Sequence, residues 1–249
     1  MIILKSPEEI EKVASACRIV AEIISDLKGM VKPGITTKDI ERFVDMMISK
    51  KDAVSAFRGY RDYPSSVCTS VNEQVVHGIP SGLVLKEGDI ISIDLGVYKD
   101  GYFGDAAITL PVGRISPEAE RLIKVTEDSL YAGIEKARRG NRVSDISHAI
   151  QNTVETHGFS VVKTFVGHGI GRSLHEDPQV PNFGAPGRGP RLMEGMTLAI
   201  EPMVNAGTYD VNILDDGWTA VTTDGSLSAH YEHTVAITKN GPRILTKID

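Results

Sequence analysis

The sequence predicts one α/β domain made of two related halves. Residues 87–97 read EGDIISIDLGV, and residues 194–204 read EGMTLAIEPMV. Each segment has a Glu-Gly turn, an apolar strand and one carboxylate in an apolar setting, which is Asp94 in the first and Glu201 in the second. A carboxylate within a buried strand is costly unless it is paired or bound to a cation. The repetition therefore suggests that both acids face one shared partner.

Shorter matches extend this duplication along the chain. Ser-Pro-Glu begins at residues 6 and 116, and Gly34 and Gly140 are each followed five residues later by Asp-Ile. The matches keep one order, at offsets of 110, 106 and 107 residues. This period is too long for a solenoid. We predict a single domain, 1–249, with halves at about 1–112 and 113–249 related by a pseudo-twofold axis.

Each half is expected to open with two helices. A capping box at residues 6–9 starts the first, and Pro33-Gly34 ends it. Thr36 and Asp39 start the second in the same way. The expected helices cover about 6–31, 36–47, 117–138 and 144–157.

The strands are expected between and after the helices. Alternating or continuous apolar runs bounded by turn residues predict strands at 89–97, 102–110, 160–166, 197–204, 218–223 and 230–238. Residues 53–76 are expected to form short strands and loops, and the Gly/Pro-rich segment 183–190 a surface loop.

Composition narrows the functional classes. The 249 residues are 41% hydrophobic and carry a net charge of −6, which argues against a nucleic-acid partner. No apolar run reaches the roughly 18 residues of a membrane span, and the start lacks the pattern of a signal peptide. Only two cysteines occur, Cys17 and Cys68, so we expect a reducing, cytoplasmic location without disulfides.

Four acids are candidates for one cation site. Asp94 and Asp105 lie on two consecutive strands joined by a turn, and a hairpin would place both on one side. Their mutual repulsion would be removed by a divalent cation. Glu201 ends one apolar strand and Glu232 opens another. Alternatively, Asp105 ends a turn and Glu232 faces solvent.

Histidines in turn-forming contexts complete the candidate site. His168 lies in Gly167-His-Gly-Ile-Gly171, where the glycines would expose its imidazole. It is either an ordinary loop residue or the nitrogen ligand beside the four acids. His77 and His175 are also flanked by turn residues. Oxygen ligands with one nitrogen suit Mn, Fe, Co or Zn, and two such ions can share carboxylates and activate a water molecule.

The motifs together resemble those of type I methionine aminopeptidases in the short bacterial form. The residues that carry the resemblance are Val67–Glu73, His77–Pro80, Asp94–Gly96, Gly104-Asp105, Gly167–Arg172, His175-Glu176, Glu201-Pro202, Trp218 and Tyr231–Thr234. They span essentially the whole chain, in the order of the family. The resemblance implies the pita-bread fold, in which two pseudo-twofold-related halves form a curved antiparallel sheet covered by helices.

The resemblance also implies roles. Asp94, Asp105, His168, Glu201 and Glu232 match the ligands of two divalent ions, with Asp105 and Glu232 bridging. A bridging hydroxide would attack the first peptide carbonyl. His77 and His175 would contact the substrate, and Glu201 would also shuttle the proton. The implied reaction removes the initiator methionine from nascent polypeptides with a small second residue, near the ribosome.

An apolar pocket for methionine is implied as well. Its expected residues are Phe57, Tyr60, Tyr63, Cys68 and Trp218, although each aromatic taken alone is explained as well by core packing. Two positions depart from the family pattern: Leu174 stands where many members have Phe, and His230 where many have Gln. The backbone around Asn72, Gln74 and Ser228 is a candidate site for a monovalent cation.

Three alternatives are open. A peptidase of the same fold that cuts before proline usually carries an extra N-terminal domain, whereas this chain starts at the first helix. An inactive, protein-binding relative would be expected to lose metal ligands, and all five are present. A structural protein with a stabilising metal would not need His77 and His175 near the ions. We expect a monomeric enzyme with no membrane partner.

Overall fold

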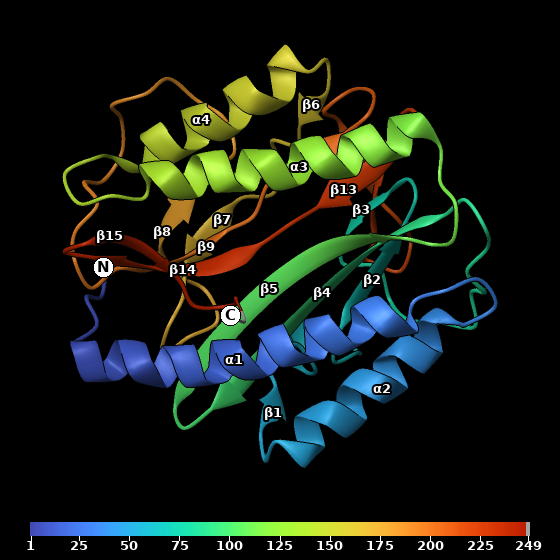
Figure 1. Ribbon diagram of the computed structural model, residues 1–249, viewed down its shortest axis with the longest axis horizontal. Coiled ribbons are helices and arrows are strands. Elements are labelled where there is room, and N and C mark those ends of the chain that lie inside the picture. Colours follow the sequence, from blue (N-terminus) through green and yellow to red (C-terminus); the bar gives the residue numbers. More distant parts are fainter. Residues whose placement is uncertain (248–249) are drawn as a thin grey trace.

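The computed structural model describes residues 1–247 and has two pairs of helices packed against antiparallel sheets (Figure 1). The helices are α1 (Pro7–Met30), α2 (Thr37–Lys50), α3 (Pro117–Lys136) and α4 (Val143–Thr156), with a short 3-10 turn η1 (Tyr60–Asp62). In Figure 1, α1 and α2 run along one side of the strands, and α3 and α4 run along the other. All four predicted helices are present, with ends within a few residues of those expected.

Local sequence explains where the helices begin. Ser6 and Glu9 form the predicted capping box at α1, with Pro7 in the first turn. Thr36 and Asp39 form a second capping box at α2. Ser116 caps α3 through its hydroxyl, which accepts a hydrogen bond from the Ala119 amide.

Two sheets carry most of the strands. In the first, β4 (Ile90–Lys99) forms a long hairpin with β5 (Tyr102–Pro111) and also pairs with β1 (Val54–Ser55) and β2 (Cys68–Val71). The second has the order β15 (Gly241–Ile244), β14 (His233–Thr238), β9 (Thr197–Ile200), β7 (Gly167–Gly169) and β8 (Glu176–Val180). Two three-stranded sheets contain β3 (Gln74–Val76), β6 (Ser160–Val161), β10 (Met203–Asn205), β11 (Val211–Ile213), β12 (Ala220–Thr222) and β13 (Ser228–His230).

The two large sheets meet where β5 passes the segment that joins β13 to β14. The Glu232 amide donates to the carbonyl of Ala107 at 2.9 Å. Thr234 Oγ1 donates to the carbonyl of Asp105 at 2.8 Å and accepts that residue's amide hydrogen at 3.3 Å. Thr109 makes the same double contact with His230, at 2.9 and 2.8 Å. Strands more than 100 residues apart in sequence are therefore locked in one register at this point.

Separate cores lie beneath the helix pairs. One is formed by α1 and α2 against β4 and β5, with fully buried Ile40, Val44, Ile93 and Leu95. The other is formed by α3 and α4 against β9 and β14, with fully buried Leu122, Ile146, Ile150 and Leu198. Within residues 1–247, no helix has the length and apolar character needed to cross a membrane.

Several strand boundaries were wrong. The strand expected at 160–166 stops at Val161, and pairing resumes only at Gly167. Val162 is buried by tertiary packing instead, in a small core with Val75 and Met203, and Phe165 and Val166 are half-buried. The strand expected at 197–204 is broken at Glu201-Pro202, where proline lacks an amide hydrogen.

Two further expected strands are shorter or broken. The strand expected at 218–223 begins at Ala220, because the Asp216 carboxylate accepts the amide hydrogens of Trp218 and Thr219 and holds them in a turn. The strand expected at 230–238 is interrupted at residues 231–232, where the Glu232 amide bonds to β5.

Candidate metal centre and substrate pocket

The β4–β5 hairpin presents two of the predicted acids on one face. Asp94 lies opposite Ala107 and Asp105 lies opposite Gly96. The two acids are therefore diagonal neighbours on the same side of the pleat. Asp105 is buried, at 4% exposure, whereas Asp94 is partly exposed. The predicted hairpin arrangement of these acids is confirmed.

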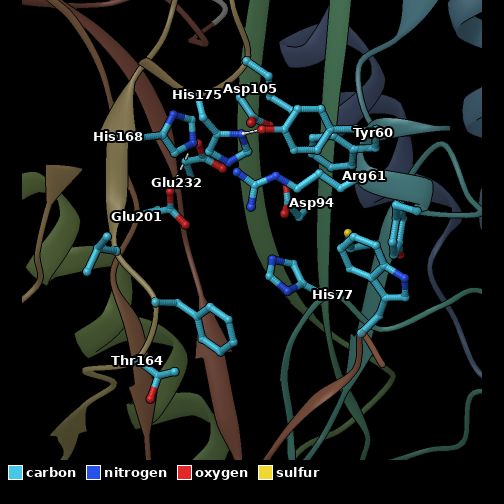
Figure 2. A pocket seen from close by; sticks show the side chains of 17 residues that line it. Tyr60, Arg61, His77, Asp94, Asp105, Thr164, His168, His175, Glu201 and Glu232 are labelled. Carbon is cyan, nitrogen blue, oxygen red and sulfur yellow. Dashed lines mark hydrogen bonds and ion pairs between the residues drawn. The ribbon is translucent and has the colours of Figure 1, made fainter. Parts of the chain in front are cut away.

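The other two acids come from breaks in the second large sheet. Glu201 follows the end of β9, and Glu232 precedes β14. At both breaks the chain leaves regular pairing, and both side chains line the same cavity as the hairpin acids (Figure 2). Glu232 is 2% exposed. The solvent-facing alternative for Glu232 is therefore excluded.

His168 lies in the middle of β7 and faces the acids. Its Nδ1–H donates to the Gly169 carbonyl at 2.8 Å, which leaves Nε2 with a free lone pair. His168 Nε2 is 3.5 Å from Glu201 Oε1. One ligand atom each from Asp105, His168 and Glu232 lie within 4.8 Å of one another, and all three residues are buried. His168 is thus part of the acid cluster and not an ordinary loop residue.

The acids lack enough protein partners for their charge. Asp94 Oδ1, Asp105 Oδ1 and Glu232 Oε1 are buried without a hydrogen-bond partner. Burial raises the pKa of Asp94 to about 7 and that of Glu201 to about 8. Burial and the neighbouring acids raise the pKa values of Asp105 and Glu232 well above their usual range. Unpaired oxygens of this kind beside an imidazole nitrogen fit divalent cations.

The histidines around the acids are neutral at pH 7. Burial lowers the pKa of His168 to about 3, and burial lowers the pKa values of His77 and His175 to about 4. The imidazole of His230 is buried, which also lowers its pKa, and its Nε2 is 3.7 Å from Glu201 Oε2. The departure from the family pattern at His230 therefore places a buried, neutral imidazole beside Glu201.

His175 and Tyr60 form a pair at the rim. The Tyr60 hydroxyl and His175 Nδ1 are 2.8 Å apart, and their rings stack with centroids 5.1 Å apart. A hydroxyl that donates to Nδ1 leaves the proton of the neutral imidazole on Nε2. His77 lies elsewhere on the wall, edge-on to the rings of Phe165 and Trp218.

One cavity of about 320 Å³ is lined by all of the predicted catalytic, metal-binding and methionine-pocket residues. The twelve are Phe57, Tyr60, Tyr63, Cys68, His77, Asp94, Asp105, His168, His175, Glu201, Trp218 and Glu232. Phe57, Tyr63, Cys68 and Leu174 are buried and form a small apolar cluster of their own at its wall. An aromatic, apolar compartment next to an acidic cluster suits a substrate with an apolar side chain and a free amine.

Sequence reasoning missed four residues of this cavity, namely Arg61, Thr164, Phe165 and Val166. The segment 164–166 was read as strand, so its side chains were expected in a sheet. Arg61 lies between Tyr60 and Tyr63, which were both predicted as pocket residues, and this position was the available signal.

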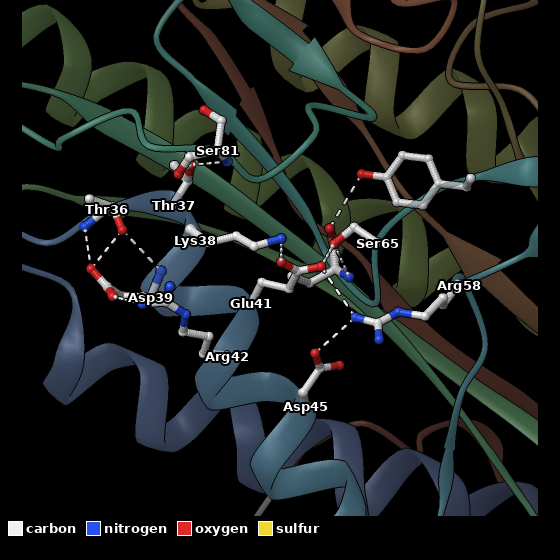
Figure 3. A network of polar contacts seen from close by, with 12 residues as sticks. Thr36, Thr37, Lys38, Asp39, Glu41, Arg42, Asp45, Arg58, Ser65 and Ser81 are labelled. Atoms are coloured by element: carbon white, nitrogen blue, oxygen red, sulfur yellow. Dashed lines mark hydrogen bonds and ion pairs between the residues drawn. The ribbon is translucent and has the colours of Figure 1, made fainter.

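A buried carboxylate on α2 holds the loop that carries the aromatic wall (Figure 3). Glu41 is 3% exposed; it accepts a hydrogen bond from Ser65 at 2.8 Å and pairs with Arg58 at 3.2 Å and with Lys38. Both ends of the loop 57–66 are thereby tied to one helix. Tyr63 adds a third attachment, because its hydroxyl donates to the Gly78 carbonyl at 3.0 Å.

Comparisons with known proteins agree with this geometry. The sequence pattern of metallopeptidase family M24 matches residues 11–239. A methionine aminopeptidase of Clostridium perfringens is 58% identical over 248 residues, and methionine aminopeptidase 1 of Bacillus subtilis is 54% identical over 248 residues; each alignment covers 100% of both chains. The crystal structure of a methionine aminopeptidase from Thermotoga maritima superposes with a TM-score of 0.98 at 49% identity, again over the whole of both chains.

Proposed function

This chain belongs to metallopeptidase family M24 and is a metal-dependent aminopeptidase that removes N-terminal methionine, and we propose that the cavity between its two large sheets is where it does so. The observation that carries the proposal is the cluster of four acids facing the free nitrogen of His168, in which Asp94, Asp105 and Glu232 each have a buried oxygen without a hydrogen-bond partner. An apolar wall of suitable size lies beside it.

We propose that Asp94, Asp105, His168, Glu201 and Glu232 hold two divalent ions of the Mn, Fe, Co or Zn class. When bound, the ions would polarise the first peptide carbonyl and activate a water molecule for attack on it. The donor set supports this proposal, since all five are hard oxygen or imidazole donors and none is a thiolate. The two hydrogen bonds between Thr234 Oγ1 and the backbone of Asp105, one accepted and one donated by the hydroxyl, support a fixed ligand geometry.

The chain's own groups supply orientation and proton handling. His175 Nε2–H is positioned to donate to the carbonyl oxygen of the substrate, because Tyr60 occupies Nδ1. Glu201 is suited to accept a proton and return it to the leaving amine, because its carboxyl faces the cavity. His77 is suited to contact the substrate next to the wall formed by Trp218.

The apolar wall supports selection of methionine. Phe57, Tyr63 and Cys68 are buried around a compartment that an unbranched thioether can fill. Tyr60 and Trp218 are partly exposed and close the compartment from the rim. We therefore propose that the substrate is a nascent chain whose first residue is methionine. A small second residue is part of the same proposal, as the family resemblance implies.

Several finer expectations stay predictions. These are the monovalent cation near Asn72, Gln74 and Ser228, the ribosome as a cellular partner, the cytoplasmic location, the monomeric state and the division into halves at about residue 112. An inactive, protein-binding relative is not favoured, since the five proposed ligands remain and share one cavity.

The function is tested with a Met-Ala-Ser peptide in the presence of Mn²⁺ or Co²⁺. We expect release of free methionine that EDTA abolishes and metal restores. Glu201→Gln should lower turnover on the order of 10²- to 10⁴-fold with an unchanged circular dichroism spectrum. An intact Met-Ala-Ser peptide together with cleavage of a Xaa-Pro peptide would instead favour an aminopeptidase that cuts before proline.

A further inference from the structure

Arg61 introduces a positive charge at the mouth of an otherwise acidic cavity. Within residues 1–247 it is the one Arg or Lys side chain that lines this cavity. Figure 2 shows its guanidinium reaching across the pocket toward His175. By contrast, Arg58 in the same loop is neutralised, because it pairs with Glu41 and Asp45. In the described part of the chain, the Arg61 guanidinium has no carboxylate partner and lies over the ring of Tyr60, 5.5 Å from its centroid.

The backbone that carries Arg61 is strained and well anchored. Arg61 and Asp62 have φ angles of 48° and 69°, in the left-handed region that disfavours side chains, and Gly59 precedes them at 82°. Positive φ angles at residues with side chains, such as Arg61 and Asp62, persist where the surrounding structure enforces them. Here the enforcement comes from the contacts of Glu41 with the loop 57–66 (Figure 3) and from the hydrogen bond of Tyr63 to Gly78. The backbone position of Arg61 is therefore held by its surroundings.

The route of the substrate brings its third residue to this side. The apolar wall for the first side chain takes Phe57, Tyr63 and Cys68 from the segment 57–68, which also carries Arg61. In an extended peptide, side chains alternate, so those of residues 1 and 3 point to the same side. A peptide whose first side chain enters the apolar compartment consequently directs its third side chain toward the loop that bears Arg61.

Exposure at the cavity supports the same route. Tyr63, Cys68 and Leu174 are buried, whereas Arg61 and His175 are exposed. The rest of the peptide must leave through an exposed part of the rim, and His175 lies at the proposed point of cleavage.

We propose that Arg61 forms a subsite for acidic side chains, and that it makes the enzyme favour substrates with Asp or Glu as the third residue. This inference rests on the proposed function of the cavity. The carboxylate would form a charge-assisted pair with the planar guanidinium. Because the site is exposed, the expected preference is modest, about threefold to fivefold in kcat/KM at low ionic strength. It should decline toward one at about 0.5 M salt, where the screening length is a few ångströms.

The test compares Met-Ala-Asp-Ser-amide with Met-Ala-Asn-Ser-amide, which differ only in charge at residue 3. We expect a kcat/KM ratio of about 3 to 5 for the metal-loaded enzyme. In Arg61→Gln the ratio should be about 1, and in Arg61→Glu it should fall below 1. Arg42→Gln is the control, because Arg42 is an exposed arginine on α2 that pairs with Asp39 away from the cavity; it should keep the wild-type ratio.

Two outcomes would overturn the inference. One is a wild-type ratio of 1, or a ratio that Arg61→Gln leaves unchanged. The other appears when the acid is moved to residue 4: an equal or larger preference there means that the alternation argument is wrong. If neither amide is cleaved while metal is bound, the proposed function itself has failed, and that result is distinct from a ratio of 1.

Discussion

The metal-free protein should carry protons on its buried carboxyls at neutral pH, so metal binding should displace them. Burial raises the pKa of Asp94 to about 7 and that of Glu201 to about 8. At pH 7 Asp94 is then about half protonated and Glu201 about nine-tenths protonated, so saturating metal releases about 1.4 protons from this pair. The raised pKa values of Asp105 and Glu232 add to that number.

The direction with pH is fixed by the same values. A carboxyl whose pKa is raised in the metal-free protein holds its proton below that pKa and loses it above. Proton release from Asp94 and Glu201 should therefore increase to about 1.9 at pH 6 and decrease to about 0.6 at pH 8, and metal affinity should weaken as the pH falls. Carboxyls with an ordinary pKa near 4 would release almost none at any of these values.

Titration calorimetry with Mn²⁺ in two buffers of different ionisation enthalpy measures the total number of protons released, to which Asp94 and Glu201 should contribute the numbers above. Glu201→Gln should reduce the release at pH 7 by about 0.9 protons. The exposed control Glu155→Gln, on α4, should leave it unchanged. A wild-type release below about 0.5 protons at pH 7, or a release that grows with rising pH, would refute the reasoning. In that case the acids are already ionised without metal.

Two further substitutions address the surroundings of the site. Thr234→Val removes both hydrogen bonds to the backbone of Asp105 with little change in shape. Metal affinity, measured by calorimetry, should fall about tenfold, and the free energy of unfolding, measured by thermal unfolding, should fall by about 1–2 kcal/mol. An unchanged metal affinity would count against a positioning role. A Cβ at Gly96 would lie 2.7 Å from Phe57 Cε1 in the pocket wall, whereas a Cβ at Gly82 meets open space. Gly96→Ala should therefore raise KM for Met-Ala-Ser several-fold more than it lowers kcat, and Gly82→Ala should change neither constant. Equal behaviour of the two variants would contradict the role assigned to the pocket wall.

The acid cluster could be found from sequence because its residues sit in local patterns, whereas the aromatic pocket residues were expected only from the family resemblance. The Asp94 and Asp105 pair follows from the period of a strand and one turn, and the register of the hairpin bears it out. His168 stands out through its flanking glycines. Glu201 could be linked to Asp94 only because the chain repeats the strand pattern. These signals depend on neighbours within a few residues, which is where sequence reasoning works best.

The rim of the cavity was less readable. Residues 164–166 have an apolar pattern that fits a strand, yet they line the cavity, and Phe165 packs edge-on against His77. Apolar periodicity reports that a side chain will be buried, and it does not say against what. Arg61 was expected only within a region of short strands and loops. Its φ of 48° belongs to a loop that is held by distant residues such as Glu41, and a local pattern does not report such contacts.

The sequence by itself determined the helices, the hairpin and the acids proposed to bind metal, because capping, turn formation and strand alternation act over a few residues. Only the tertiary structure decided that β5 and the segment before β14 meet, since that contact depends on hydrogen bonds such as that from Glu232 to Ala107 across more than 100 residues. This meeting brings acids from both parts of the chain into one cavity, where the loss of water raises their pKa values and leaves their oxygens in need of a cation.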